Sequence, residues 1–115
     1  GHLLEMMNGS GTTAVVAASS VPLLEGVVET AVSGAIPGGT RDNFSHTEGN
    51  VRYGDGISDT MRLVLNDAQT SGGLLISVPG NKLEDLRAGL GARSVMCAVI
   101  GEVVSERDKR IVVKR

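Results

Sequence analysis

The chain has 115 residues, of which 41% are apolar and 21% are charged, and these values are typical of one soluble domain with a single core. The net charge of −2 excludes a strongly basic surface for nucleic acid or for an anionic membrane. No apolar run approaches the roughly 18 residues of a membrane span, and no secretory signal is visible, so we expect a cytoplasmic protein.

Two features of the composition are unusual. Glycine accounts for 16 residues, whereas Phe44 and Tyr53 are the only aromatic residues, so the core must consist of aliphatic side chains and methionine. The single cysteine, Cys97, excludes an internal disulfide. Its apolar neighbours predict that it is a small buried hydrophobic residue rather than a reactive thiol.

Apolar spacing predicts the first elements of the chain. A helical stripe over residues 3–7 is followed by an apolar run, typical of a strand, over residues 12–18. A second helix is predicted over residues 22–34, because proline suits a first helical turn and glycine a helix end.

Residues 37–56 show no period, and we expect a long loop there. Loops of this length in compact domains are usually functional or disordered. Both aromatic residues lie in this stretch, which suggests that they anchor the loop against another surface. His46 also lies here and is expected to be a solvated loop residue rather than a metal ligand.

The second half of the chain predicts further strands and helices. Ser58 suits the N-cap of a short helix, and Asn81, with Glu84 three residues later, suits the N-cap of another. Continuous apolar runs predict buried strands over residues 74–78 and 94–100, the second of which could extend to residue 104.

The order of these elements predicts how the sheet is connected. A strand, a helix and a strand in succession indicate a βαβ unit with parallel strands. A last strand over residues 111–113 is expected to form a hairpin with the strand before it. Together the elements predict an α+β fold with a mixed sheet of about four strands, and residues 1–115 form one domain without internal repeats.

The most distinctive local sequence is the segment from Asp67 to Leu75. Adjacent glycines permit close backbone approach, and such turns can form an anion-binding nest. Asp67 could bind a metal ion or a water molecule. The alternative interpretation is a plain turn between a helix and a strand. The candidate phosphate-binding residues of this segment are Gln69, Thr70, Ser71, Gly72 and Gly73.

A second glycine-rich segment precedes it. Pro37 fixes the backbone and Gly38 and Gly39 free it, which predicts a sharp reversal, with Thr40 and Asn43 exposed for binding. Taken alone, this segment is equally typical of a structural turn. The sequence contains no Walker-type phosphate loop, no His-Glu-x-x-His, no Cys-x-x-Cys and no EF-hand loop.

These segments together resemble selenophosphate synthetase (selenide, water dikinase). The similarity follows the family's order in three places along the chain: 34–40 with 43–44, 67–75, and 100–103. The first residues resemble the helix that follows the family's Thr-Gly-Phe-Gly segment. One departure is Ala68, where the family usually has proline, and it loosens the entry to the turn.

The resemblance implies a C-terminal domain of the ATP-binding superfamily that includes aminoimidazole ribonucleotide synthetase. The family makes selenophosphate, AMP and phosphate from ATP, selenide and water, with Mg²⁺. Its catalytic cysteine or selenocysteine, its lysine and its magnesium ligands lie in an N-terminal domain that this chain lacks. The chain is then expected to hold no catalytic residue and no cofactor by itself, and to complete an ATP site at the cleft between the domains.

The resemblance also implies a homodimeric full-length enzyme. Two other interpretations stay open. The chain could be a non-catalytic binding or regulatory module of the same fold, or part of a related enzyme with another substrate, such as a purine or thiamine precursor. The Gln-Thr-Ser-Gly-Gly string argues against the last of these.

Overall fold

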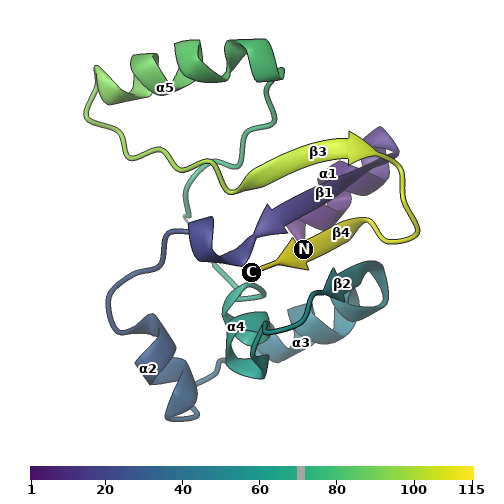
Figure 1. Ribbon diagram of the computed structural model, residues 1–115. Helices are drawn as coiled ribbons and strands as arrows, with labels where there is room; N and C mark the ends of the chain where they lie inside the picture. The colour runs from purple at the N-terminus through teal and green to yellow at the C-terminus, as the bar shows by residue number, and fades with distance from the viewer. Residues whose placement is uncertain (70–71) are drawn as a thin grey trace.

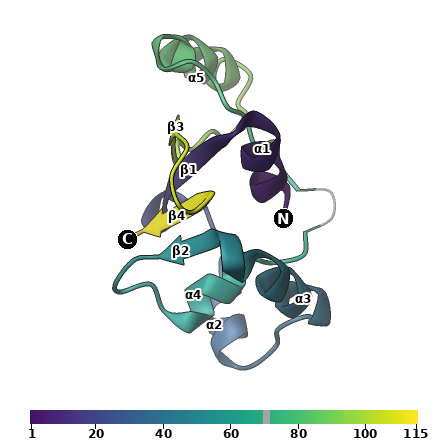
Figure 2. The same ribbon diagram turned by 90° about the vertical axis from the view of Figure 1, so that its right-hand side faces the viewer.

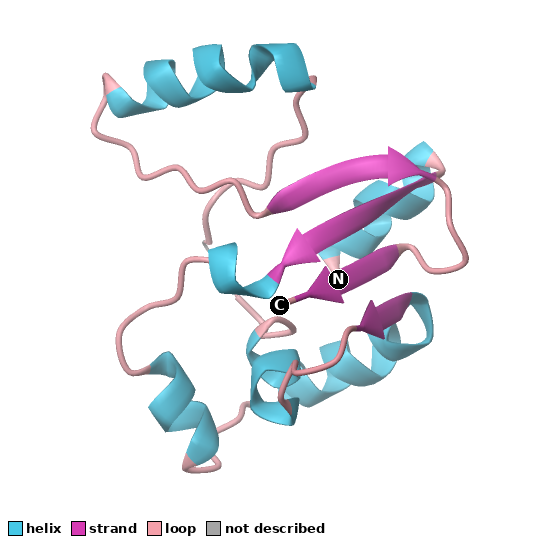
Figure 3. Ribbon diagram, viewed as in Figure 1, coloured by secondary structure: helices cyan, strands magenta, loops and turns pink. Residues whose placement is uncertain are grey.

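The computed structural model describes residues 1–69 and 72–115. These residues form five α-helices and one four-stranded mixed sheet, which confirms the predicted α+β class (Figures 1 and 3). The strand order across the sheet is β2-β4-β1-β3. The strands are β1 (Thr12–Ala17), β2 (Val51–Tyr53), β3 (Gly101–Ser105) and β4 (Ile111–Lys114).

Strand β1 is the centre of the core. It pairs in parallel with β4 and antiparallel with β3, and its four middle residues are all buried. Helix α1 (His2–Ser10) contacts β1 and contributes buried Leu4 and Met7, as its apolar stripe predicts. The helix ends at the C-cap residue Gly11, whose φ of 64° suits glycine. The main core cluster comprises Leu4, Met7, Ala14, Val16, Ala18, Ile57, Ile111 and Val113.

Helices gather at the β2 side of the sheet. Figure 2 shows α2 (Val27–Val32), α3 (Gly38–Thr47) and α4 (Asp59–Val64) together on that side. The predicted cap of α4 is confirmed, because Ser58 Oγ accepts a hydrogen bond of 3.2 Å from the Met61 amide. Helix α2 is shorter than predicted and begins after Gly26, whose φ is 79°, so Pro22 precedes it. Short 3₁₀ turns cover Ala18–Ser20, Glu48–Asn50 and Gly80–Lys82.

The expected loop over residues 37–56 is wrong. The structure places helix α3, a 3₁₀ turn and strand β2 there. Apolar spacing does not reveal this helix, because three of the four positions on its buried face are polar: Thr40 and Thr47 are fully buried, and Asn43 is half-buried beside Phe44. These four residues have the i, i+3, i+4, i+7 spacing of one helical face. The periodicity was present, but it was not carried by apolar side chains. The expectation that Thr40 and Asn43 are exposed for binding is therefore wrong.

The predicted hairpin between the last two strands is also wrong. Strand β4 lies on the opposite side of β1 from β3, so the two never pair. Thr13, on β1, fixes the connection between them: its hydroxyl donates to the Lys109 carbonyl at 3.0 Å and accepts from the Arg107 amide at 2.9 Å. Because Thr13 is fully buried, these bonds guide the chain across the end of β1.

Of the two strands predicted around the last helix, only the extension of the second forms, as β3. Helix α5 (Leu83–Gly91) forms as expected, but residues 74–78 and 94–99 pair with no strand of the described sheet, and the carbonyl of Ile100 accepts a 2.8 Å bond from the Ala17 amide. Helix α5 and the segments on either side of it lie beyond β3, away from the other strands of the sheet (Figure 1). A continuous apolar run indicates burial only where a partner surface exists. Without one the predicted βαβ unit does not form, and several large side chains are exposed: Leu74, Leu75, Ile76, Val95, Met96 and Val99.

Two further expectations for this region are corrected. Cys97 is exposed rather than buried, because the segment that carries it lies outside the sheet. Asn81 does not cap α5: the N-cap residue is Lys82, which makes no side-chain cap bond, and Asn81 lies in the preceding 3₁₀ turn. Glu84 pairs with Arg87 at 3.0 Å instead of returning to the cap.

Gly101 opens β3 where the backbones of β1 and β3 come closest. A Cβ atom at this position would overlap the Val15 carbonyl oxygen and lie 3.0 Å from Val16 Cα. Gly101 is paired with Val16 in the ladder, so both neighbours belong to the central strand. Glycine is therefore required by the approach of another backbone rather than by a positive φ.

Candidate functional site

The fold brings the two glycine-rich segments of the sequence together. Thr40, in the first turn of α3, donates a hydrogen bond of 2.7 Å from Oγ1 to Asp67 Oδ1. The Ala68 amide donates in turn to Thr40 Oγ1 at 3.4 Å. Since these residues lie 27 positions apart in the chain, the contact joins α3 to the turn that follows α4. We call this contact the Thr40–Asp67 junction.

Other residues of the two segments tighten the junction. Asn43 Nδ2 donates to the Asn66 carbonyl at 3.2 Å, one residue before Asp67. A Cβ atom added to Gly39 would lie 3.2 Å from the Ala68 side chain, which is tighter than ordinary contact, whereas the same addition at Gly38 would meet nothing. Gly39 thus permits the close packing of α3 against Ala68, whereas the space beside Gly38 is unoccupied within 4 Å.

The junction places a helix N-terminus beside Asp67, where the sequence predicted only a turn before a strand. The first amides of a helix have no acceptor within it, and its dipole is positive at this end. Pro37 is the N-cap residue of α3 and provides no side-chain cap. The arrangement can therefore attract an anion, and the Asp67 carboxylate is one oxygen donor beside it.

A buried polar network supports the junction from behind. Asn66 is 7% exposed and donates through Nδ2 to Tyr53 Oη and to the Arg62 carbonyl, both at 2.8 Å. Its Oδ1 accepts from Thr47 Oγ1 at 2.7 Å. The sequence analysis missed Asn66, Thr47 and Arg62, although the polar stripe of α3 and the position of Asn66 next to Asp67 both pointed to them.

The two aromatic residues act as anchors within the chain. Phe44 of α3 and Tyr53 of β2 stack with ring centroids 6.4 Å apart. The Arg62 guanidinium lies 5.2 Å from the centroid of the Tyr53 ring. The rings do not anchor a loop against another surface, contrary to the sequence prediction: they join α3 to β2, and Arg62 adds a contact from α4. His46 is exposed, as expected.

Tyr53 should ionise late. Burial raises the pKa of Tyr53 above its ordinary 10.0, although the Asn66 hydrogen bond and the Arg62 charge oppose the shift. Because Tyr53 is the single tyrosine, phenolate absorbance reports on it alone. We expect its titration midpoint to lie above that of the denatured chain, and to move further up in Asn66→Ala.

The raised pKa of Tyr53 also makes the stability of the fold depend on pH. A folded pKa above the unfolded value means that the contribution of Tyr53 is fully present below about pH 10 and is lost as the pH rises through the folded pKa. An equal midpoint in the native and denatured chains would contradict the burial of the hydroxyl.

The remaining candidate residues lie at the other end of the segment. Thr70 and Ser71 lie outside the described residues. Gly72 and Gly73 are exposed, and a Cβ at Gly72 would lie 3.1 Å from Gln69 Oε1, so the Gln69 side chain folds back toward Gly72. Over residues 1–69 and 72–115 no cluster of three His, Cys, Asp or Glu side chains forms a metal centre around Asp67 or elsewhere. The described helices include none that is long and apolar enough to cross a membrane.

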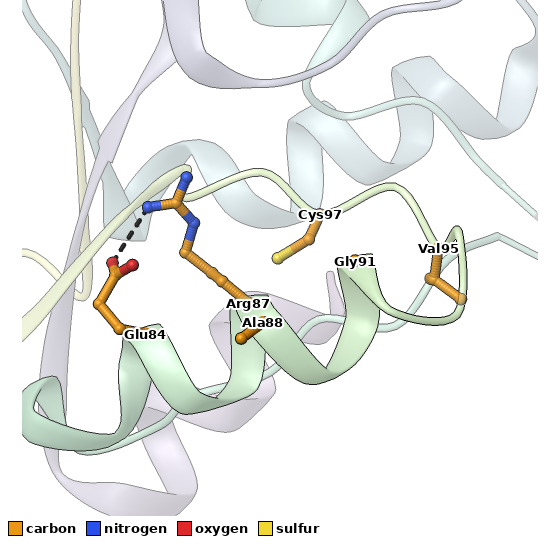
Figure 4. Close-up of a pocket in the computed structure, with 6 residues that line it drawn as sticks. All are labelled: Glu84, Arg87, Ala88, Gly91, Val95 and Cys97. Atoms are coloured by element: carbon orange, nitrogen blue, oxygen red, sulfur yellow. Dashed lines mark hydrogen bonds and ion pairs between the residues drawn. The ribbon is translucent and has the colours of Figure 1, made fainter.

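A cavity of about 350 Å³ lies away from the junction, between α5 and the segment that follows it (Figure 4). Its lining includes Cys97, and Arg87 is already paired with Glu84 there. None of the residues that the sequence singled out for phosphate binding lines it. The Thr40–Asp67 junction therefore remains the place where the sequence motifs converge.

Comparison with known proteins identifies the fold family. The family described as "AIR synthase related protein, C-terminal domain" matches residues 1–114. The chain belongs to this family. The predicted resemblance to this superfamily is thereby confirmed.

The most similar relatives include three enzymes named selenide, water dikinase. The one from Pelobacter propionicus is 44% identical over 115 residues, covering 99% of this chain and 33% of the relative. The one from Myxococcus xanthus is 42% identical, covering 90% and 29%. The one from Salmonella typhi is 40% identical, covering 99% and 32%. The resemblance seen in the motifs is confirmed, and the chain spans about a third of the length of these relatives.

Proposed function

We propose that this chain is the C-terminal domain of a selenide, water dikinase, and that the Thr40–Asp67 junction helps complete an ATP site at the cleft with an N-terminal domain. The observation that carries the proposal is the convergence of the two glycine-rich segments at the N-terminus of α3. The relatives are named selenide, water dikinase. The resemblance to that family implies the reaction, which is formation of selenophosphate, AMP and phosphate from ATP, selenide and water. The full-length enzyme is proposed to be a cytoplasmic homodimer that uses Mg²⁺.

The chemistry of the junction fits a nucleotide phosphate with its metal ion. Free amides at the start of α3 suit phosphate oxygens, and the Asp67 carboxylate suits Mg²⁺, which binds through one or two carboxylates and the substrate phosphates. Bound Mg²⁺ would neutralise phosphate charge. The chain's own part is positional: Thr40 orients Asp67, and Gly39 leaves room for the Ala68 side chain against α3. Phosphoryl transfer depends mainly on such placement and charge stabilisation.

The test is selenide-dependent AMP release by the full-length protein that contains this chain, with the 115-residue chain assayed in parallel. We expect AMP from the full-length protein only with selenide, and none from the chain alone. Gly39→Val, which would push Ala68 away from α3, should lower kcat/KM for ATP by about tenfold or more. Arg107→Gln, on the exposed turn between β3 and β4, is the control and should leave activity unchanged.

Two results would contradict the proposal in different ways. A full-length protein that makes no AMP under reducing conditions with Mg²⁺ would favour a binding or regulatory module of the same fold. Normal activity in Gly39→Val would agree with the proposed enzyme but would show that the Thr40–Asp67 junction is not part of its ATP site.

A further inference from the structure

A second cavity, of about 370 Å³, lies between α3 and α4. Helix α3 contributes Arg41, Phe44 and Ser45 to its lining, and α4 contributes Asp59, Arg62 and Leu63. None of these residues was a candidate in the sequence, and none is used by the proposed ATP site. The volume is at the small end of ligand pockets, so a compact ligand is the appropriate size.

The polar lining of this cavity is cationic. Its lining includes two arginines and one aspartate, and Ser45 adds a neutral hydroxyl donor. Arginine presents a planar set of donors that matches the oxygens of phosphate. The Asp59 side chain is 94% exposed, so its 3.3 Å ion pair with Arg62 is weak and readily exchanged.

Arg62 is held in place. Its guanidinium lies 5.2 Å from the centroid of the Tyr53 ring, and the Tyr53 hydroxyl is fixed by Asn66. The ion pair of Arg62 with the exposed Asp59 carboxylate joins Asp59 Oδ1 to Nη1 at 3.3 Å. A cation that is already positioned loses little freedom when it binds an anion.

The apolar wall of the cavity narrows the choice of ligand. Phe44 and Leu63 lie on the same lining as the two arginines. Phe44 is fixed by its stack with Tyr53, so its position does not depend on a ligand. We infer that the α3–α4 cavity binds the phosphate group of a small phosphomonoester, with Arg41, Arg62 and Ser45 on the phosphate and with Phe44 and Leu63 against its apolar body.

The proposal is tested by a titration of the ¹⁵N-labelled 115-residue chain followed by NMR. The probes are phenyl phosphate, inorganic phosphate and phenol. We expect phenyl phosphate to shift the amides of residues 41–45 and 59–63 with a Kd of about 1 mM, inorganic phosphate to shift them at higher concentration, and phenol not to shift them. Equal shifts with phenol, or no shifts with phenyl phosphate up to about 20 mM, would overturn the proposal.

Three substitutions make the test specific. Arg41→Gln should weaken phenyl phosphate binding by about tenfold, whereas Arg107→Gln, the same charge change on a distant exposed arginine, should leave it unchanged. Asp59→Asn should tighten binding by about threefold, because it removes the ion pair that competes for Arg62 and removes a negative charge that repels the phosphate. All three side chains are exposed, so the spectra should retain the native dispersion. Equal weakening by both arginine variants, or weaker binding in Asp59→Asn, would show non-specific attraction instead.

Discussion

Gly101→Ala is expected to lower the free energy of unfolding by about 3 to 5 kcal/mol. The added Cβ would overlap the Val15 carbonyl oxygen and crowd Val16 Cα, and both atoms belong to the backbone of the central strand. A flexible side chain could move aside, but this backbone is held by β3 on one side and by β4 on the other. Relief therefore requires separating β3 from β1 and breaking ladder hydrogen bonds.

The measurement is equilibrium denaturation, with Gly9→Ala as the matched control. Gly9 lies within α1, and a Cβ there would meet nothing within 4 Å. Alanine at that position should raise stability by about 0.5 to 1 kcal/mol, because glycine costs more conformational entropy in a helix. If the two variants changed stability alike, the close approach of β3 to β1 would be wrong.

Asn66→Ala is expected to cost about 2 to 4 kcal/mol of unfolding free energy. The substitution removes the Asn66 acceptor of the buried Thr47 hydroxyl, which keeps only its 3.2 Å bond to the Phe44 carbonyl, and it removes the donor to the Tyr53 hydroxyl. It also loses the bond to the Arg62 carbonyl. Buried polar groups that lose their partners carry the full cost of desolvation, so the effect should exceed that of any single exposed hydrogen bond.

The control for this prediction is Asn50→Ala, an exposed asparagine in the 3₁₀ turn before β2. Denaturation of both variants, together with Thr47→Val and the Thr47→Val/Asn66→Ala double variant, forms a cycle that isolates the coupling of the two side chains. Additive losses, or an Asn66→Ala loss no larger than that of Asn50→Ala, would mean that the network does not support the fold.

The elements predicted well from the sequence are those whose environment is uniform. Helix α1 and strand β1 pack against the core, so apolar spacing was sufficient for both. Apolar spacing did not predict helix α3, because its buried face meets the Asn66 amide and the Asp67 carboxylate rather than aliphatic side chains. The prediction of a strand over residues 74–78 was wrong for the opposite reason: these residues are apolar, but no strand of the described sheet pairs with them.

The sequence predicted the two segments of the candidate site, but it did not predict that they contact each other. Glycine pairs mark positions of close backbone approach, and Gly39 meets that expectation at Ala68. The bond from Thr40 to Asp67 could not be read from the sequence, since it depends on where α3 begins and α4 ends. Position 68, where the resemblance implies proline, is alanine here. Alanine has the backbone N–H that proline lacks, and this amide donates a hydrogen bond to Thr40 Oγ1.

The position of β4 has a consequence for how the chain is made. Residues 111–114 lie between β1 and β2, which are translated much earlier, and they are the only link between those two strands in the sheet. A nascent chain that has not reached Ile111 therefore carries two strands with no ladder between them, and the apolar residues of β1 remain available to other molecules. Assembly of the sheet therefore depends on contacts between residues far apart in the sequence, which favours slow folding.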